Sequence, residues 1–165
     1  SSRDTINLML EQEFAFRIAR PVNEKITAEQ LPDYVAAIAP AIEISQVNFA
    51  SDEFNGLDII ANNALAYKVV IGEWHPADKM RMLDATGVSL SCEGVVLTRG
   101  KGDNTMHGQA KALLWLINHI IDQGYKIQQD QVLITGNLVK MIPATPCLYK
   151  ADFGQFGKLD LQITP

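Results

Sequence analysis

The segment 8–18 constrains the fold most, because it places two carboxylates inside an apolar, aromatic run. Glu11 and Glu13 are two residues apart, and side chains two apart on a strand project from the same face. The pattern therefore predicts a long strand that displays both glutamates on one face. The opposite face would carry the residues that pack into a core: Leu10, Gln12, Phe14, Phe16 and Ile18.

A third carboxylate has the same apolar setting, because Glu43 lies between Ile42 and Ile44. Carboxylates on such strands are costly to bury unless a positive charge meets them. A hard divalent cation, bound by oxygen ligands, would supply that charge. Two other interpretations stay open from spacing alone: the polar face could be solvated, or Arg17 and Arg20 could pair with the glutamates.

Composition limits the classes of protein to which the chain can belong. A length of 165 residues, with 47% hydrophobic and 20% charged residues, predicts a single domain over 1–165 with one core. A net charge of −5 and the lack of a basic stripe argue against nucleic acid as a partner. No apolar stretch has membrane-spanning length. Cys92 and Cys147 lack metal or redox spacing, which predicts reduced core thiols in a cytoplasmic protein.

Strands and helices alternate irregularly, as in α+β domains. Thr27 and Gln30 match a capping box, which predicts a helix through about residue 38. Apolar residues at helical spacing from Leu113 to Ile121 predict a second helix, which Gly124 ends. Further strands are expected at 39–49, 65–72, 88–92, 95–98, 131–135, 146–152 and 158–163, with 56–64 irregular, 74–76 a break and a last hairpin that turns at Gly154 and Gly157.

Six segments, in this order, resemble the 2-keto-4-pentenoate hydratase and 4-oxalocrotonate decarboxylase family of the fumarylacetoacetate hydrolase superfamily. They extend from about residue 9 to the end, so the resemblance covers nearly the whole chain. The segments are EQEFAFRIAR, LPDYVAAIAPAIEI, DIIANNA, TRGKG with the helix ALLWLINHIIDQG, QVLITGNLVKMIPA and ADFGQFGKLDLQI.

The resemblance implies an α+β fold, a mixed β-sheet roll or sandwich with packed helices, similar to the fumarylacetoacetate hydrolase C-terminal domain. It implies that Glu11, Glu13 and Glu43 bind Mg²⁺ or Mn²⁺. A 2-oxo acid would chelate this ion, which would stabilise an enolate. Hydration and decarboxylation share that intermediate, so both activities fit. The resemblance also implies a homo-oligomer, or an assembly with a partner enzyme of the same aromatic-catabolic pathway.

At other positions the chain matches the family pattern only in part. Asn63, Thr135 and Gly136 match residues that contact the substrate or the attacking water. Four positions depart from the family pattern and put the substrate in doubt: Asn62 for the usual aspartate, Leu65 for a common serine, Lys68 in an apolar or small-residue strand, and Lys140 in a turn of small residues and proline.

The general base is unknown. Family members carry a long N-terminal segment with a lysine believed to serve in acid–base catalysis, whereas this sequence begins at Ser1, ten residues before Glu11. The sequence is thus expected to be either a fragment of a longer protein or a protein without that segment. In the second case His107 and Lys140 are the candidates for the base, although a loop histidine without a partner is the more ordinary interpretation of His107.

Four other features have structural interpretations. We expect His75 to be solvated in a turn, His119 to lie on a helix surface and Trp115 to lie in the core. Gly100 and Gly102 form a Gly-x-Gly pattern that is too short to indicate phosphate binding.

Two main hypotheses about function remain. The first is a metal-dependent lyase, a hydratase or decarboxylase, that acts on a 2-oxo or 2-hydroxy-dienoic acid. The second is a binding or assembly subunit that has lost full catalysis; an acylpyruvate hydrolase is a third option. The three glutamates favour the lyase, because a pure scaffold has no reason to retain costly paired carboxylates.

Overall fold

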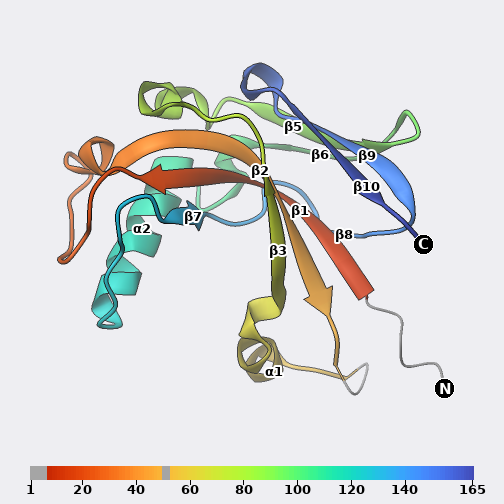
Figure 1. The fold of residues 1–165 in the computed structure, drawn as a ribbon, viewed down its shortest axis with the longest axis horizontal. Helices are drawn as coiled ribbons and strands as arrows, with labels where there is room; N and C mark the ends of the chain where they lie inside the picture. The colour runs from red at the N-terminus through yellow and green to blue at the C-terminus, as the bar shows by residue number, and fades with distance from the viewer. Residues whose placement is uncertain (1–6, 50–52) are drawn as a thin grey trace.

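The computed structural model describes residues 7–49 and 53–165 and is built on two antiparallel sheets (Figure 1). The first sheet has the order β3-β2-β1-β7, in which long strands β1 (Asn7–Ile18) and β2 (Val35–Val47) form the centre. The remaining strands of this sheet are shorter: β3 (Ala66–Ile71) and β4 (His75–Pro76) pair with β2, and β7 (Val132–Ile134) and β8 (Ile142–Pro143) pair with β1.

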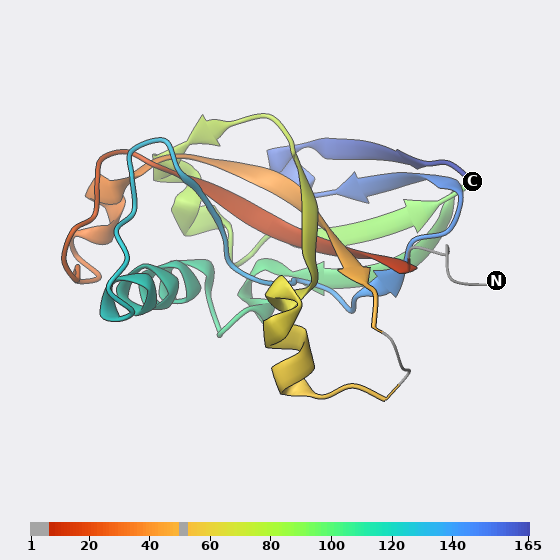
Figure 2. The same cartoon turned by 60° about the horizontal axis from the view of Figure 1, so that its bottom comes forward.

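The second sheet has the order β10-β9-β5-β6. Its strands are β5 (Gly87–Cys92), β6 (Val95–Lys101), β9 (Cys147–Asp152) and β10 (Lys158–Ile163). The helices are α1 (Gly56–Ala61) and α2 (Gln109–Asp122), with 3₁₀ turns η1 (Leu31–Tyr34), η2 (Asn63–Leu65), η3 (Ala77–Met82), η4 (Gly102–Asn104) and η5 (Gly154–Phe156). Figure 2 shows α2 beneath one end of the first sheet and α1 projecting from the body.

The core forms between the two sheets and helix α2. The Phe14 ring meets the rings of Phe153 and Phe156 edge-on, with centroids 5.6 and 5.5 Å apart. Leu113 and Ile117 of α2 join the same apolar cluster and are fully buried. This packing uses the face of β1 that the alternating pattern predicts, so the opposite face of β1 carries the glutamates away from the core.

The predicted fold class, a sheet-dominated α+β domain with packed helices, is confirmed. The long first strand, the hairpin that turns at Glu93 and Gly94, helix α2 and the final hairpin all occur where the pattern places them. Each of these elements has a strong local signal, either alternation with a period of two or apolar residues at helical spacing.

The prediction of a helix that begins at Thr27 is wrong. The Gln30 side chain does accept the backbone N–H of Thr27, at 2.9 Å, so half of a capping box is present. The chain then forms only the 3₁₀ turn η1 before β2 begins at Val35. β2 pairs with β1 along nearly its whole length, and this sheet pairing overrides the local helix signal.

Two segments without a predicted element do form one. The stretch 56–64 contains α1, which begins at a complete capping box formed by Asn55 and Asp58. The predicted break at 74–76 contains the two-residue strand β4, where Pro76 pairs with Ala37.

Two predictions about side chains are wrong as well. Cys92 and Cys147 form a disulfide, because the pairing of β5 with β9 brings their Cα atoms to 6.2 Å. They are separated by 55 residues in sequence, so no local pattern indicates the bond. Trp115 lies on the surface of α2, 52% exposed, where it stacks on His119, itself exposed as predicted. No helix within 7–49 or 53–165 is long and apolar enough to cross a membrane.

Candidate metal centre

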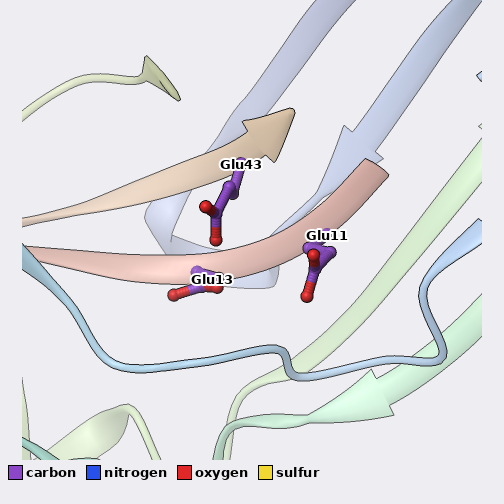
Figure 3. Close-up of side chains that lie close together, drawn as sticks. All are labelled: Glu11, Glu13 and Glu43. Carbon is purple, nitrogen blue, oxygen red and sulfur yellow. The ribbon is translucent and has the colours of Figure 1, made fainter. Parts of the chain in front are cut away.

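Strands β1 and β2 bring the three glutamates together (Figure 3). Glu11 and Glu43 are directly opposite each other in the strand register, and Glu13 lies two residues further along β1. One carboxylate oxygen from each of the three residues lies within 4.8 Å of the others. The predicted convergence of the three side chains is therefore present, whereas their role as metal ligands remains a prediction.

The face that carries the glutamates is made of small residues near their side chains. Glu13 is paired with Ala41, and Ala15 and Ala39 continue the same face. Glu13 is only 2% exposed, whereas Glu11 and Glu43 are half-buried. The short alanine side chains leave the carboxylates room to converge instead of displacing them toward solvent.

Two hydrogen bonds orient the carboxylates. The backbone N–H of Gly136 donates to Oε2 of Glu13 at 2.7 Å, and the Ser45 hydroxyl donates to Oε1 of Glu11 at 2.6 Å. Each of these bonds engages one oxygen of its carboxylate. These two bonds fix the orientation of Glu11 and Glu13, and a hydrogen bond between the side chains of Glu13 and Glu43 links the third carboxyl group to them.

The carboxylates repel one another in a poorly solvated site. Burial raises the pKa of Glu13 to about 8, a rise that the Gly136 N–H opposes and that Glu43 and Glu11 reinforce. Burial also raises the pKa of Glu43, while a hydrogen bond with Glu13 lowers it and the charge of Glu11 raises it. A site that holds three acidic groups at this cost is suited to a ligand of high positive charge.

The predicted alternative of arginine partners is wrong. Arg17 lies over the ring of Trp74, 5.2 Å from its centroid. Arg20 lies over Tyr34 and pairs with Asp33. Over the ranges 7–49 and 53–165, no ion pair includes a glutamate of the cluster. Three oxygen donors without a counter-charge fit a hard divalent cation such as Mg²⁺ or Mn²⁺.

We expect metal-free stability and metal affinity to change with pH in opposite directions. Because the folded pKa of Glu13, about 8, exceeds its ordinary value of 4.5, the folded state retains a proton that the unfolded state loses. Without metal, the stability from this group is complete below about pH 4.5 and is lost as pH rises through 8. Mg²⁺ must displace the same proton, so it should bind roughly 75-fold more weakly at pH 6 than at pH 8.5.

Melting curves in EDTA and Mg²⁺ titrations, each recorded at both pH values, would measure these two trends. The Glu13→Gln variant is the matched control for the melting curves, because its amide does not titrate. Wild-type protein should lose several degrees of melting temperature relative to this variant between pH 6 and pH 8.5. Parallel pH profiles for the two proteins would contradict the assignment of the raised pKa to Glu13.

A hollow of about 310 Å³ lies beside Glu43. Asn63, predicted to contact the substrate, lines this hollow, so the structure brings Asn63 and the glutamate cluster together. The rest of its lining comes from strands β3 and β7: Ala66, Tyr67, Lys68, Val69 and Ile134. Its volume is at the lower end for small-molecule pockets, which suits a small acid.

The other predicted substrate residues, Thr135 and Gly136, lie just after β7. Gly136 contacts the cluster through its N–H bond to Glu13. The hydroxyl of Thr135 donates to Oε1 of Gln109 at 2.7 Å, so this side chain is held by α2. The predicted contact of either residue with a substrate remains a prediction.

Sequence analysis missed two residues that support the site. Gln109 is fully buried and links Thr135 to the main chain, because its Nε2 donates to the Gly102 carbonyl at 2.7 Å. The signal for Gln109 is weak: a polar residue at the start of an apolar helix. Ser45 had a clearer signal, because it is two residues from Glu43 and therefore on the same strand face.

The two candidate bases do not line this hollow. His107 and Lys140 are both exposed, and neither is among the described residues that line the hollow. His75, expected to be solvated, instead bonds through Nε2 to the Phe156 carbonyl at 3.0 Å and meets the Phe156 ring edge-on.

Asn62 and Leu65, two of the positions that depart from the family pattern, lie at the end of α1 and just after it. Asn62 is the C-cap of α1, and Leu65 has a positive φ of 67°.

Two packed antiparallel sheets, with three acidic side chains that converge on the outer face of one of them, define a domain with a candidate metal site. Residues 2–152 match the family described as fumarylacetoacetate (FAA) hydrolase C-terminal, and the chain belongs to this family.

Curated relatives agree with the resemblance found in the sequence. The chain is 27% identical over 157 residues to 2-keto-4-pentenoate hydratase from Burkholderia vietnamiensis strain G4. It is 21% identical over 156 residues to 4-oxalocrotonate decarboxylase from a Pseudomonas species. Each alignment covers 94% of this chain and 60% of the relative, so the chain spans little more than half the length of these proteins.

Solved structures show the same fold. The 4-oxalocrotonate decarboxylase from Pseudomonas putida G7, complexed with magnesium and adipate, superposes with a TM-score of 0.85 at 16% identity. The match covers 93% of this chain and 59% of that chain. A maleylpyruvate hydrolase from Sphingobium sp. SYK-6, in complex with manganese and pyruvate, gives a TM-score of 0.72 at 13% identity.

Proposed function

We propose that this chain carries the metal site of a lyase, a hydratase or decarboxylase, that acts on a 2-oxo or 2-hydroxy-dienoic acid. The observation that carries the proposal is the cluster of Glu11, Glu13 and Glu43, whose oxygens converge within 4.8 Å. Glu13 is almost completely buried, and within the described ranges no ion pair balances the cluster. Relatives named as hydratases and as a decarboxylase support this class of reaction.

The three glutamates would hold the cation, Mg²⁺ or Mn²⁺, through oxygen ligands. When bound, this ion supplies a Lewis acid that polarises a 2-oxo group. The donor set supports a hard cation because it contains carboxylates alone, without a cysteine or histidine.

The chain's own residues would orient and enclose the substrate. Gly136 and Ser45 hold the carboxylates in place through their hydrogen bonds. Val69 and Ile134 give the hollow apolar walls for a carbon chain, and Asn63 offers an amide for a hydrogen bond. The general base stays unassigned, and neither candidate, His107 or Lys140, lines the hollow.

Deuterium exchange tests the proposal directly. The chain is incubated in D₂O with Mg²⁺ and 2-oxobutanoate, and loss of the C3 proton signal is followed by NMR. We expect exchange faster than the buffer reaction, because a site that favours the enolate promotes loss of this proton. Chelation by EDTA should abolish the acceleration. Absence of exchange from folded, metal-loaded protein would contradict catalysis by this chain alone.

A second candidate is a binding or assembly subunit without full catalysis. The observation that favours it is that the hollow, as lined by the described residues, contains neither of the two candidate bases. Metal binding without any exchange would support this second candidate. A homo-oligomeric assembly and a cytoplasmic location remain predictions for both candidates.

A further inference from the structure

The loop 135–138, which follows β7, bonds to β1 at the candidate metal centre. The N–H of Gly136 donates to Oε2 of Glu13 at 2.7 Å. The N–H of Leu138 donates at 2.8 Å to the carbonyl of Gln12, which lies between the two glutamates of β1. The loop comes after the last residue of β7 and before β8, so its conformation depends on bonds from other segments.

Three successive carbonyls of this loop accept hydrogen bonds from two neighbouring side chains. Oγ1 of Thr105 lies 3.0 Å from the carbonyl oxygen of Gly136 and 3.1 Å from that of Asn137. A hydroxyl has one hydrogen, so Thr105 shares it between the two carbonyls. Nδ2 of Asn104 donates to the carbonyl of Leu138 at 2.9 Å. The end of η4 thus holds the loop through its carbonyls, while β1 holds it through its N–H groups.

Gly136 needs this support because its own backbone is adaptable. Its φ of 109° lies in the left-handed region that favours glycine, and glycine loses more conformational freedom on folding than any other residue. A Cβ atom at Gly136 would lie 3.3 Å from Cγ2 of Thr105, so the methyl group of Thr105 lies directly beside the glycine. The hydroxyl and the methyl group of this half-buried side chain therefore both restrict the position of the Gly136 peptide.

We propose that Thr105 is a positioning residue of the metal centre, and that its hydroxyl keeps the N–H of Gly136 directed at Glu13. The inference rests on the proposed function, because the glutamates are taken as the ligands of the cation. Thr105 acts through Gly136 and leaves the cation itself to the carboxylates. A carboxylate that is held by a fixed donor needs less reordering when it binds a metal, and loss of such a partner typically lowers metal affinity by about 10- to 100-fold.

Calorimetric titration of three variants with Mg²⁺ tests this role. Thr105→Val has nearly the shape of the wild-type side chain but lacks the hydroxyl, so it should bind Mg²⁺ about tenfold more weakly than wild type. Thr105→Ser restores the hydroxyl and should bind within about twofold of wild type. Thr86→Val is the matched control, because the Thr86 hydroxyl also donates to a backbone carbonyl, that of Met82 at 2.9 Å, away from the loop. This control should leave the Mg²⁺ affinity unchanged.

The NMR signal of the Gly136 amide proton separates positioning from a general loss of stability. This N–H donates to a carboxylate at 2.7 Å, so its signal should lie downfield of ordinary glycine amides. In Thr105→Val the signal should move upfield, whereas in Thr86→Val it should stay in place. Both valine variants lose a hydrogen bond to a carbonyl, so both should lose a few degrees of melting temperature. A merely structural role for Thr105 would lower the melting temperature without moving the Gly136 signal.

Asn104→Ala provides a second test that does not alter the core, because Asn104 is exposed. It removes the bond to the Leu138 carbonyl in the same loop and should weaken Mg²⁺ binding by about threefold. Unchanged affinity in this variant would overturn the view that the end of η4 positions the loop.

The possible outcomes separate this inference from the function on which it rests. Mg²⁺ binding by Thr105→Val within about twofold of wild type would overturn the role of Thr105 and leave the proposed function intact. Equal weakening in Thr86→Val, or a Gly136 signal that does not move in Thr105→Val, would do the same. Failure of wild-type protein to bind Mg²⁺ would overturn both proposals. A loss of about tenfold in Thr105→Val that serine restores, with the Gly136 signal displaced, would support the inference.

Discussion

Glu13→Gln is expected to weaken Mg²⁺ binding by at least about 100-fold, or ~2.7 kcal/mol. The substitution removes one of three converging carboxylates, the most buried of them, and replaces a charged ligand with a neutral one. The amide oxygen can still accept the Gly136 N–H bond that Glu13 accepts at 2.7 Å. We therefore expect the fold to survive, and metal-free protein at pH 8.5 to be at least as stable as wild type.

Calorimetric titration with Mg²⁺, combined with melting curves in EDTA, would measure both effects. Glu24→Gln is the matched control, because Glu24 is exposed and lies outside the cluster. It should leave the affinity for Mg²⁺ unchanged. A Glu13→Gln affinity within threefold of wild type would contradict the assignment of Glu13 as a ligand.

Gly102→Ala is expected to have the largest effect on stability, a loss of roughly 3 kcal/mol and about 10 °C in melting temperature. A Cβ atom at Gly102 would overlap the backbone carbonyl of Leu83, which cannot move as a flexible side chain can. The Gly102 carbonyl also accepts the Nε2 donor of Gln109, which holds Thr135. The variant should therefore also weaken Mg²⁺ binding, through displacement of the segment that contains Gly136.

Thermal unfolding of Gly102→Ala beside Gly87→Ala would check this expectation. A Cβ at Gly87 has no heavy atom within 4 Å, so the control isolates the steric overlap from the general cost of replacing a glycine. Equal melting temperatures for the two variants would contradict the packing account. Gly100 is similarly crowded by the Leu138 carbonyl, so close backbone packing explains the Gly-x-Gly pattern without a phosphate.

Local patterns in the sequence were sufficient to predict the strands that carry the site. Alternation with a period of two places Glu11 and Glu13 on one face of β1 without any knowledge of the rest of the chain. Register is not local, so the pairing of Glu11 with Glu43 could be inferred only from the family resemblance. The same limit explains the disulfide, which depends on the alignment of β5 with β9.

Errors arose where tertiary contacts override local preference. The residues after Thr27 carry a helix signal, but the chain there leads into β2, which pairs with β1. Trp115 has helical spacing with apolar neighbours, but it is on the outer side of α2. The side-chain amide of Gln109 bonds to Gly102 and Thr135, and its backbone N–H donates to Asp84. No spacing within the sequence indicates that these segments meet at Gln109.

The central claim is that Glu11, Glu13 and Glu43 form one divalent-cation site, and anomalous diffraction from crystals soaked in Mn²⁺ tests it most directly. The account predicts a single strong anomalous peak within bonding distance of all three carboxylates, at about 2.2 Å from their oxygens. The peak should vanish in crystals of Glu13→Gln. A cluster without a peak in Mn²⁺-saturated crystals, with the glutamates bonded instead to arginine or lysine side chains, would contradict the claim.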